Sequence, residues 1–205
     1  MRPVSDSLSR QEMPLKPEIF HGRDDLVEDI AQLLLREETS RVCILGPGGM
    51  GKTSVSLAVV ELPLIKERFR EENVIWVPCI EATSATLLLE ILHIQLQVPG
   101  DQQVTLERII SELNTLKQPR LIVVDNFETP WNGNQKQVGD ILRRLAMLSH
   151  IAILVTMRGA EDALHATGPS NGNRKKSNLQ TKQPAFASTI TLIQIQKTTR
   201  KSLDY

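Results

Sequence analysis

The feature that most constrains this chain is the stretch Gly46–Thr53, Gly-Pro-Gly-Gly-Met-Gly-Lys-Thr, which fits the pattern Gly-x-x-x-x-Gly-Lys-[Ser/Thr] at every fixed position. An apolar run, Val42–Leu45, precedes it, and a stretch with apolar residues at helical spacing, Val55–Leu62, follows it. Glycines allow a tight backbone turn in which successive N–H groups point inward at an anion. The stretch and its flanks therefore predict a strand, a phosphate-binding loop and a helix, in that order.

Two residues at the end of this loop carry side-chain chemistry. The helix that begins near Lys52 contributes its positive N-terminal end, and the Lys52 ammonium can reach the β- and γ-phosphates of a nucleotide. Thr53 can offer its hydroxyl to a magnesium ion. The alternative is a glycine-rich turn that binds nothing, and the complete match with both flanks in place argues against it. The nucleotide-binding residues expected here are Gly46, Pro47, Gly48, Gly49, Met50, Gly51, Lys52, Thr53 and Ser54.

Short apolar runs alternate with amphipathic stretches along the chain, a pattern typical of βα units around a parallel sheet. Leu121–Val124 is apolar at every position, as a central strand buried on both faces requires. We therefore predict an α/β fold: a three-layer P-loop NTPase with a mostly parallel central sheet and irregular N- and C-terminal segments. The expected strands are Val42–Leu45, Val74–Val77, Leu121–Val124 and Ile151–Val155, and the expected helices lie near Leu26–Leu34, Val55–Leu62, Ala85–Gln97, Thr105–Lys117 and Val138–Leu145.

Composition divides the chain into three segments. Residues 1–17 are polar and proline-containing, so we expect a flexible leader. Residues 18–167 hold the expected nucleotide-binding domain. Residues 168–205 begin with a polar linker and are expected to form a poorly ordered tail. Within this tail, Thr189–Ile195 has high β propensity and either adds an edge strand or stays unpaired.

The overall composition carries no direct signal for nucleic acid or membrane binding. The 24 Lys and Arg residues balance the 24 Asp and Glu residues, so no net charge attracts a polyanion. No stretch approaches the roughly 20 apolar residues that a membrane span requires. The two cysteines, Cys43 and Cys79, lie in apolar runs and are expected to be reduced core thiols. These features favour a cytoplasmic protein.

Three further candidates stand at or just after the ends of expected strands. Asp125 follows a buried strand, where an acid in a phosphate-loop fold holds magnesium, although a turn aspartate beside Asn126 is the alternative. Glu128 is either the base that activates the attacking water or a solvated loop residue. Arg158 either senses the γ-phosphate or pairs with a surface carboxylate. The catalytic candidates are thus Lys52, Glu128 and Arg158, and the metal candidates are Thr53 and Asp125.

These motifs resemble those of the STAND class of P-loop NTPases, the signal-transduction ATPases that include NB-ARC and NACHT proteins. The resemblance covers about Pro14–Arg158, and it is especially similar to the NB-ARC-like branch whose Walker B acid begins Asp-Asn-Phe-Glu-Thr-Pro-Trp, as in Asp125–Trp131. The matched pieces are the lead-in Ile19–Asp24, the Walker A loop Gly46–Thr53, the Walker B stretch Leu121–Glu128 and the sensor-arginine strand Val155–Arg158.

The resemblance implies a sheet in which the sensor strand lies between the phosphate-loop strand and the Walker B strand, with Arg158 near Lys52 and Asp125. Members of this class act as switches that are closed with ADP and assemble when ATP is exchanged in. The resemblance therefore implies ATP, ADP and Mg²⁺ as ligands, and protein partners or self-association in a longer architecture. The lead-in residues implied to contact adenine and ribose are Phe20, Gly22 and Arg23.

Two departures from the class bear on function. Asn126 stands where relatives carry a second acid, which puts fast hydrolysis in doubt. The helical and winged-helix subdomains that normally clamp ADP do not follow Ala160, which leaves a truncated or misjoined reading frame as one interpretation of the tail. The expected function is a STAND-like switch with slow or absent hydrolysis. The alternatives are a non-enzymatic remnant or interaction protein and, less supported because no kinase lid is visible, another P-loop NTPase.

Overall fold

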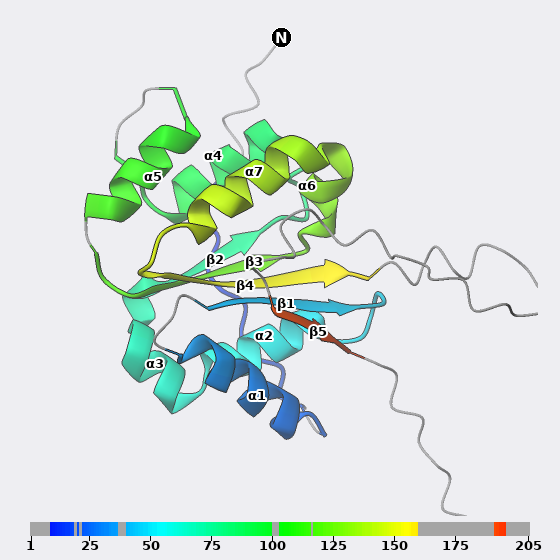
Figure 1. The fold of residues 1–205 in the computed structure, drawn as a ribbon. Helices are drawn as coiled ribbons and strands as arrows, with labels where there is room; N and C mark the ends of the chain where they lie inside the picture. The colour runs from blue at the N-terminus through cyan, green and yellow to red at the C-terminus, as the bar shows by residue number, and fades with distance from the viewer. Residues whose placement is uncertain are drawn as a thin grey trace, which may run out of the picture.

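A computed structural model describes residues 9–18, 20, 22–36, 40–99, 103–115, 117–159 and 191–195. In this part of the chain, a five-stranded sheet in the order β2-β3-β4-β1-β5 lies between two layers of helices (Figure 1). Every neighbouring pair of strands is parallel. The predicted three-layer α/β fold is confirmed. The strands are β1 (Arg41–Gly46), β2 (Val74–Pro78), β3 (Arg120–Asp125), β4 (Ile151–Arg158) and β5 (Thr191–Gln194).

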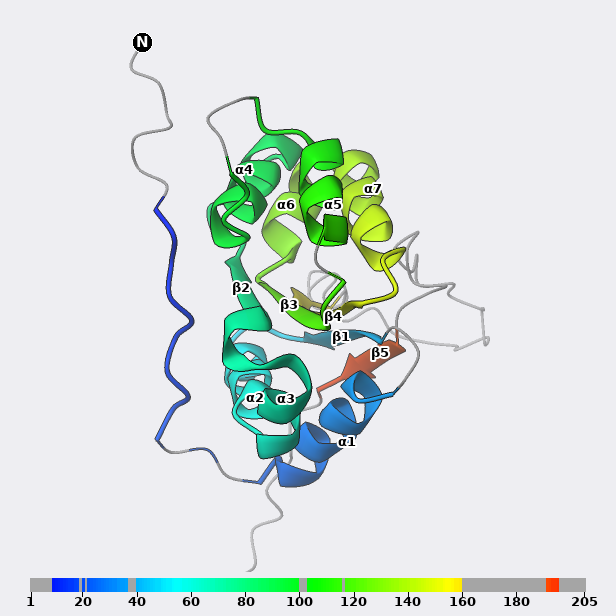
Figure 2. The ribbon, with the colours of Figure 1, turned by 90° about the vertical axis from the view of Figure 1, so that its left-hand side faces the viewer.

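The helices divide between the two faces of the sheet, as Figures 1 and 2 show from two directions. One face is covered by α1 (Asp24–Leu34), α2 (Lys52–Val60) and α3 (Pro63–Phe69), and the other by α4 (Ala85–Gln95), α5 (Leu106–Thr115), α6 (Glu128–Gly133) and α7 (Gln135–Ala146). A short 3-10 helix, η2 (Glu71–Asn73), leads into β2.

Two short helices, α3 and α6, are absent from the sequence prediction. Each carries a proline in its first turn, Pro63 in α3 and Pro130 in α6. The first turn of a helix tolerates proline because the N–H groups there have no intrahelical acceptor. Glu128 is consequently the first residue of a helix, and not a loop residue.

The central strands are apolar because both of their faces are covered. In β3, Leu121 and Val123 belong to the core under α1, α2 and α3, whereas Ile122 and Val124 belong to the core under α4–α7. All strands run in one direction, so their carboxyl ends meet at one edge of the sheet. The order also confirms that β4 lies between β1 and β3.

The stretch near residue 190 forms the edge strand that the sequence left open. β5 pairs in parallel with β1, the Ile195 N–H donates to Leu45 O at 2.7 Å, and Ile195 is buried. Gly46 permits this approach, since a Cβ at that residue would lie 3.1 Å from Ile195 O. The expectation that the packed core ends near Thr167 is therefore wrong for residues 191–195. The linker expected from Gly168 lies outside the described residues.

The leader was expected over residues 1–17, and the structure describes it from Ser9 onward. This part is an extended segment that lies beside β2 and α4 (Figure 2). Met13 packs against the core under α1, α2 and α3. The structure thus places residues 9–17 against the domain, and the flexibility expected of them stays a prediction. The helix that follows begins at Asp24 and has no side-chain cap. Asp24 and Asp25 are acidic residues in its first turn, where they complement the helix dipole.

Both cysteines are buried and free, as predicted. Burial raises the pKa of the Cys43 thiol to about 12, and the charge of Glu128 acts in the same direction. Burial also raises the pKa of Cys79. Both thiols are therefore protonated and unreactive at neutral pH. None of the helices within the described ranges is long and apolar enough to cross a membrane.

Candidate functional site

The loop Gly46–Thr53 joins β1 to α2 at the carboxyl edge of the sheet, as predicted. Gly49 and Gly51 have positive φ angles of 74° and 72°, a region that side chains with a Cβ rarely adopt. Gly48 and Gly49 are exposed, and Ser54 is half-buried in the first turn of α2. The loop thus has the left-handed turns that a phosphate-binding backbone requires.

Lys52 begins α2 and is buried, although lysine is rarely buried without polar partners. Its ammonium donates hydrogen bonds to the carbonyl oxygens of Gly46 at 2.8 Å and Pro47 at 2.9 Å. The charged group is therefore held inside the curve of its own loop. An anion entering that curve would meet the ammonium and the positive end of α2 together.

Asp125 at the end of β3 is buried and is held by two threonine hydroxyls. Thr53 Oγ1 lies 3.0 Å from Oδ1 and 3.1 Å from Oδ2 of the carboxylate. Thr156 Oγ1, from β4, donates to Oδ1 at 2.5 Å. The three residues come from α2, β3 and β4, so the parallel sheet brings together side chains that are far apart in the sequence.

Thr156 is a site residue that the sequence analysis missed. Its hydroxyl also accepts a hydrogen bond from the Asn126 N–H at 3.0 Å, and its side chain is buried. Asn126 has a φ of 58°, a left-handed conformation in which asparagine is enriched among non-glycine residues. The available signal was a single polar residue in an otherwise apolar strand, Ile151–Met157, beside the acid strand.

Thr156→Val removes this hydroxyl with little change of shape, and we expect it to lower the free energy of unfolding by about 1–3 kcal/mol. The valine leaves the buried Asp125 carboxylate and the Asn126 N–H each without one partner. Urea unfolding followed by circular dichroism measures the change. Thr156→Ser should restore most of the loss, and Thr86→Val on the exposed side of α4 is the matched control. Equal stability of the Thr156→Val and Thr86→Val proteins would contradict this role.

The cluster around Asp125 fits a magnesium ion that also contacts phosphate. Mg²⁺ prefers oxygen ligands and is commonly held by one or two carboxylates, with substrate phosphates and water completing its shell. The carboxylate of Asp125 and the hydroxyl of Thr53 supply such oxygens beside the loop. Within the described residues no group of three or more His, Cys, Asp or Glu side chains is placed to hold a metal ion.

The electrostatics of Asp125 also fit a bound cation. Burial raises the pKa of its carboxyl above the ordinary value, and the nearby charge of Glu128 adds to this, while hydrogen bonds from Thr156 and Thr53 act in the opposite direction. A carboxylate in this setting gains from a neighbouring positive charge, because the charge offsets its loss of hydration.

Arg158 and Glu128 form an ion pair at the same edge of the sheet. Arg158 Nε lies 3.1 Å from Glu128 Oε1, and the Arg158 backbone N–H donates to Oε2 at 3.3 Å. The arginine side chain is 57% exposed and that of the glutamate 14% exposed. The guanidinium also lies beside the loop, since a Cβ at Gly48 would be 3.6 Å from Arg158 Cζ. Arg158 therefore pairs with a carboxylate and lies beside the loop, and its role as a sensor of the γ-phosphate stays a prediction.

Among the lead-in residues, Arg23 contacts the loop. Arg23 Nη1 donates a hydrogen bond to Met50 O. Phe20 is half-buried against the core under α1, α2 and α3, and the Lys16 ammonium lies 5.3 Å from its ring centroid. Gly22 is exposed, with a φ of 75°. The structure thus brings Arg23 to the loop.

Solved structures that share this fold include two Aeropyrum pernix proteins and one Saccharomyces cerevisiae protein. The Aeropyrum pernix ORC2 protein, in ADPNP–ADP complexes, matches with a TM-score of 0.62 and 16% identity over 90% of this chain and 49% of its own. The A. pernix ORC1 protein, in complex with DNA, matches with a TM-score of 0.59 and 17% identity over 87% of this chain and 46% of its own. The Saccharomyces cerevisiae Hsp104–ADP complex matches with a TM-score of 0.54 and 16% identity over 90% of this chain and 23% of its own.

These likenesses identify the P-loop ATPase fold, and the chain spans about half or less of the length of these proteins. No curated protein sequence matches the chain. A family profile described as Novel STAND NTPase 1 matches residues 13–184, which include the lead-in, the phosphate loop and the strands that carry Asp125 and Arg158. The chain therefore belongs to the novel STAND NTPase 1 family.

Proposed function

We propose that this chain is a nucleotide-operated P-loop module that binds ATP and ADP with Mg²⁺ at Gly46–Thr53 and hydrolyses ATP slowly. The observation that carries the proposal is the joining of the loop to the acid strand, in which Thr53 contacts both carboxylate oxygens of Asp125. Membership of the STAND family and the P-loop fold support nucleotide binding, and the switch function is inferred from them.

The residues of the loop have distinct roles in this proposal. The loop N–H groups and the start of α2 bind the phosphates, and Lys52 exchanges its bonds to the Gly46 and Pro47 carbonyls for bonds to phosphate oxygens. Asp125 and Thr53 hold Mg²⁺, which when bound neutralises charge on the transferred phosphoryl group. Thr156 positions Asp125 for that task.

Slow hydrolysis follows from the state of Glu128. A general base must be free to accept the proton of the attacking water, whereas here the carboxylate is paired with Arg158 and accepts a backbone hydrogen bond as well. A γ-phosphate beside Gly48 would compete for the guanidinium and release the glutamate. The released Glu128 then orients the attacking water, and turnover is slow because the carboxylate acts as base only in complexes in which the pair is open.

The two members of the pair are separable by mutation. Glu128→Gln should abolish ATP turnover and change the Kd for ATP by no more than about twofold, because it removes the base and leaves the binding groups. Arg158→Ala should lower the turnover and also the preference for ATP over ADP, since it removes a charge directed at the γ-phosphate. Phosphate release and calorimetric titration measure the two effects.

The exposed pair Arg144–Glu107, 2.6 Å apart on α7 and α5, provides the matched controls Arg144→Ala and Glu107→Gln. These should leave turnover and affinity at the wild-type values. Wild-type turnover in Glu128→Gln would eliminate the glutamate as base. Absence of turnover in the wild-type protein, with nucleotide still bound, would favour the alternative of a non-enzymatic nucleotide-binding remnant or interaction protein.

We infer protein partners or self-association, because STAND-type switches are read out by assembly, and we place the protein in the cytoplasm. The DNA in the A. pernix ORC1 complex is a ligand of that protein. For this chain a net charge of zero offers no general attraction to DNA, so we do not assign it a nucleic-acid ligand.

A further inference from the structure

Gln95 is a buried amide in a helix face that is otherwise apolar. The inward-facing stripe of α4 contains Leu88, Ile91, Leu92 and Gln95, and the glutamine side chain is only 4% exposed. A buried amide must find hydrogen-bond partners, because leaving them unmade costs more than an apolar side chain of the same size would. The catalytic proposal assigns no role to this residue.

The partners of Gln95 are main-chain groups of two other segments. We assign the amide orientation from its surroundings: with the NH₂ group facing carbonyl oxygens, Gln95 donates to Trp76 O on the edge strand β2 at 3.3 Å and to Gln11 O at 3.1 Å. Its own oxygen accepts from the Gln11 N–H at 2.8 Å. The Gln95 amide therefore links the edge strand β2 to Gln11. It bonds both the N–H and the C=O of Gln11, the two groups that an adjacent β-strand would bond.

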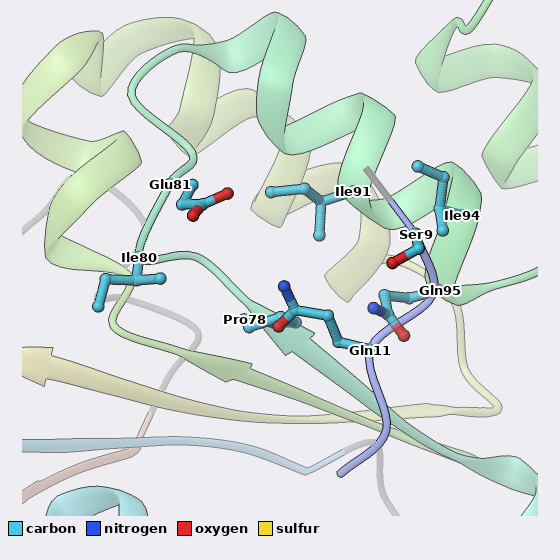
Figure 3. Close-up of a pocket in the computed structure, with 8 residues that line it drawn as sticks. All are labelled: Ser9, Gln11, Pro78, Ile80, Glu81, Ile91, Ile94 and Gln95. Atoms are coloured by element: carbon cyan, nitrogen blue, oxygen red, sulfur yellow. The ribbon is translucent and has the colours of Figure 1, made fainter. Parts of the chain in front are cut away.

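The leader contributes little besides its main chain. Ser9, Arg10, Gln11 and Glu12 are exposed and Met13 is half-buried, so side-chain burial does not explain why the segment lies there. Figure 3 shows Gln11 and Ser9 on the segment facing α4 and the end of β2. Beneath them is a cavity of about 10 Å³, the size of one water molecule.

We propose that the edge of β2 and α4 form a docking surface for an extended polypeptide segment, that Gln95 holds the segment by its main chain, and that residues 9–13 of this chain occupy the surface in cis. Hydrogen bonds to the main chain of a bound peptide do not depend on the peptide's side chains. Extended peptides that add to a sheet edge are held by such bonds. The exposed side chain of Ile80, 67% exposed at the rim of the cavity, offers an apolar contact to such a segment.

Residue-specific hydrogen exchange of the full chain tests the docking. We expect the Gln11 amide to be protected in the wild type, and Gln95→Ala to speed its exchange by roughly tenfold or more, with protection in β3 unchanged. Gln32→Ala, at an exposed helix position, is the matched control and should leave the leader protected. Exchange of Gln11 in the wild type at the rate of an unstructured peptide would overturn the proposal.

A second variant keeps the core intact. Gln11→Pro removes the donated N–H without touching α4, and should release the leader and leave the docking surface open. A labelled peptide of residues 7–18 should then bind to the Gln11→Pro protein in fluorescence anisotropy, and should bind the wild type at least about tenfold more weakly, because the tethered leader competes at a high effective concentration. Arg10→Pro, which removes a neighbouring exposed residue's N–H, is the control and should behave as the wild type.

Equal peptide binding by the Gln11→Pro protein and by the Gln11→Pro, Gln95→Ala double variant would also overturn the proposal. Leader protection that rises with protein concentration would overturn docking in cis and assign the segment to a second copy of the chain. None of these measurements requires nucleotide, so a failure of the docking proposal and a failure of nucleotide binding are distinguishable.

Discussion

Lys52→Ala is expected to weaken binding of both ATP and ADP by roughly 10- to 100-fold, the range set by losing one charge-assisted hydrogen bond of about 1.5–3 kcal/mol. In the folded protein this ammonium is already inside the loop, bonded to Gly46 O and Pro47 O, so no other residue needs to move for it to meet a phosphate. Isothermal titration calorimetry of both nucleotides with Mg²⁺ measures the change.

The control for this experiment is Lys66→Ala, which removes an exposed lysine paired with Glu61 at 2.7 Å. It should leave nucleotide affinity at the wild-type value. Circular dichroism should show that both variants are folded. Equal affinity of folded Lys52→Ala and wild-type proteins would rule out the loop as the phosphate site.

Asp125→Asn is expected to remove the magnesium dependence of ATP binding. In the wild type we expect Mg²⁺ to tighten ATP binding by roughly tenfold or more relative to EDTA, equivalent to about 1.4 kcal/mol, and in the variant the ratio should fall close to one. The amide keeps the volume of the carboxylate but loses its charge, and the two threonine hydroxyls that the carboxylate accepts from lose a strong acceptor.

Calorimetric titration of ATP with and without Mg²⁺ provides both ratios. Asp140→Asn serves as the control. Asp140 is an exposed carboxylate that pairs with Arg143 on the same helix, and this ion pair does not involve the loop. A magnesium effect of wild-type size in Asp125→Asn would show that the metal is held elsewhere.

The local parts of the site were predictable because their signals are local. The glycine positions in Gly46–Thr53 specify the loop conformation by themselves. The apolar runs before Asp125 and Arg158 identified the strands that end at the site. The uniformly apolar runs also indicated that both faces of the sheet are covered, whereas they carry no information on which strands pair or in which register.

Three features were not predictable from the sequence, because each depends on residues far apart in the chain. The role of Thr156 appears only when β4 lies beside β3. The pairing of Glu128 with Arg158 depends on α6 beginning at Glu128, where a turn was expected. The place of β5 depends on the open edge of β1.

The position of the leader was also not predictable from the sequence. Its polar, proline-containing composition indicated a flexible segment, because composition measures how much apolar surface a segment can bury. In the structure the main chain of Gln11 lies within hydrogen-bond distance of the Gln95 amide, a contact that sequence composition does not report.

The sequence by itself determined the fold class, the glycine-rich loop Gly46–Thr53 and the strands that end beside it, because these follow from backbone conformation and from hydrophobic periodicity within short stretches. Only the tertiary structure decided which polar side chains act together. Thr53 and Asp125 are 72 residues apart, and Glu128 and Arg158 are joined across α6 and β4. Such contacts arise because parallel strands align their carboxyl ends at one edge of the sheet, an arrangement set by strand order and packing rather than by any single stretch of sequence.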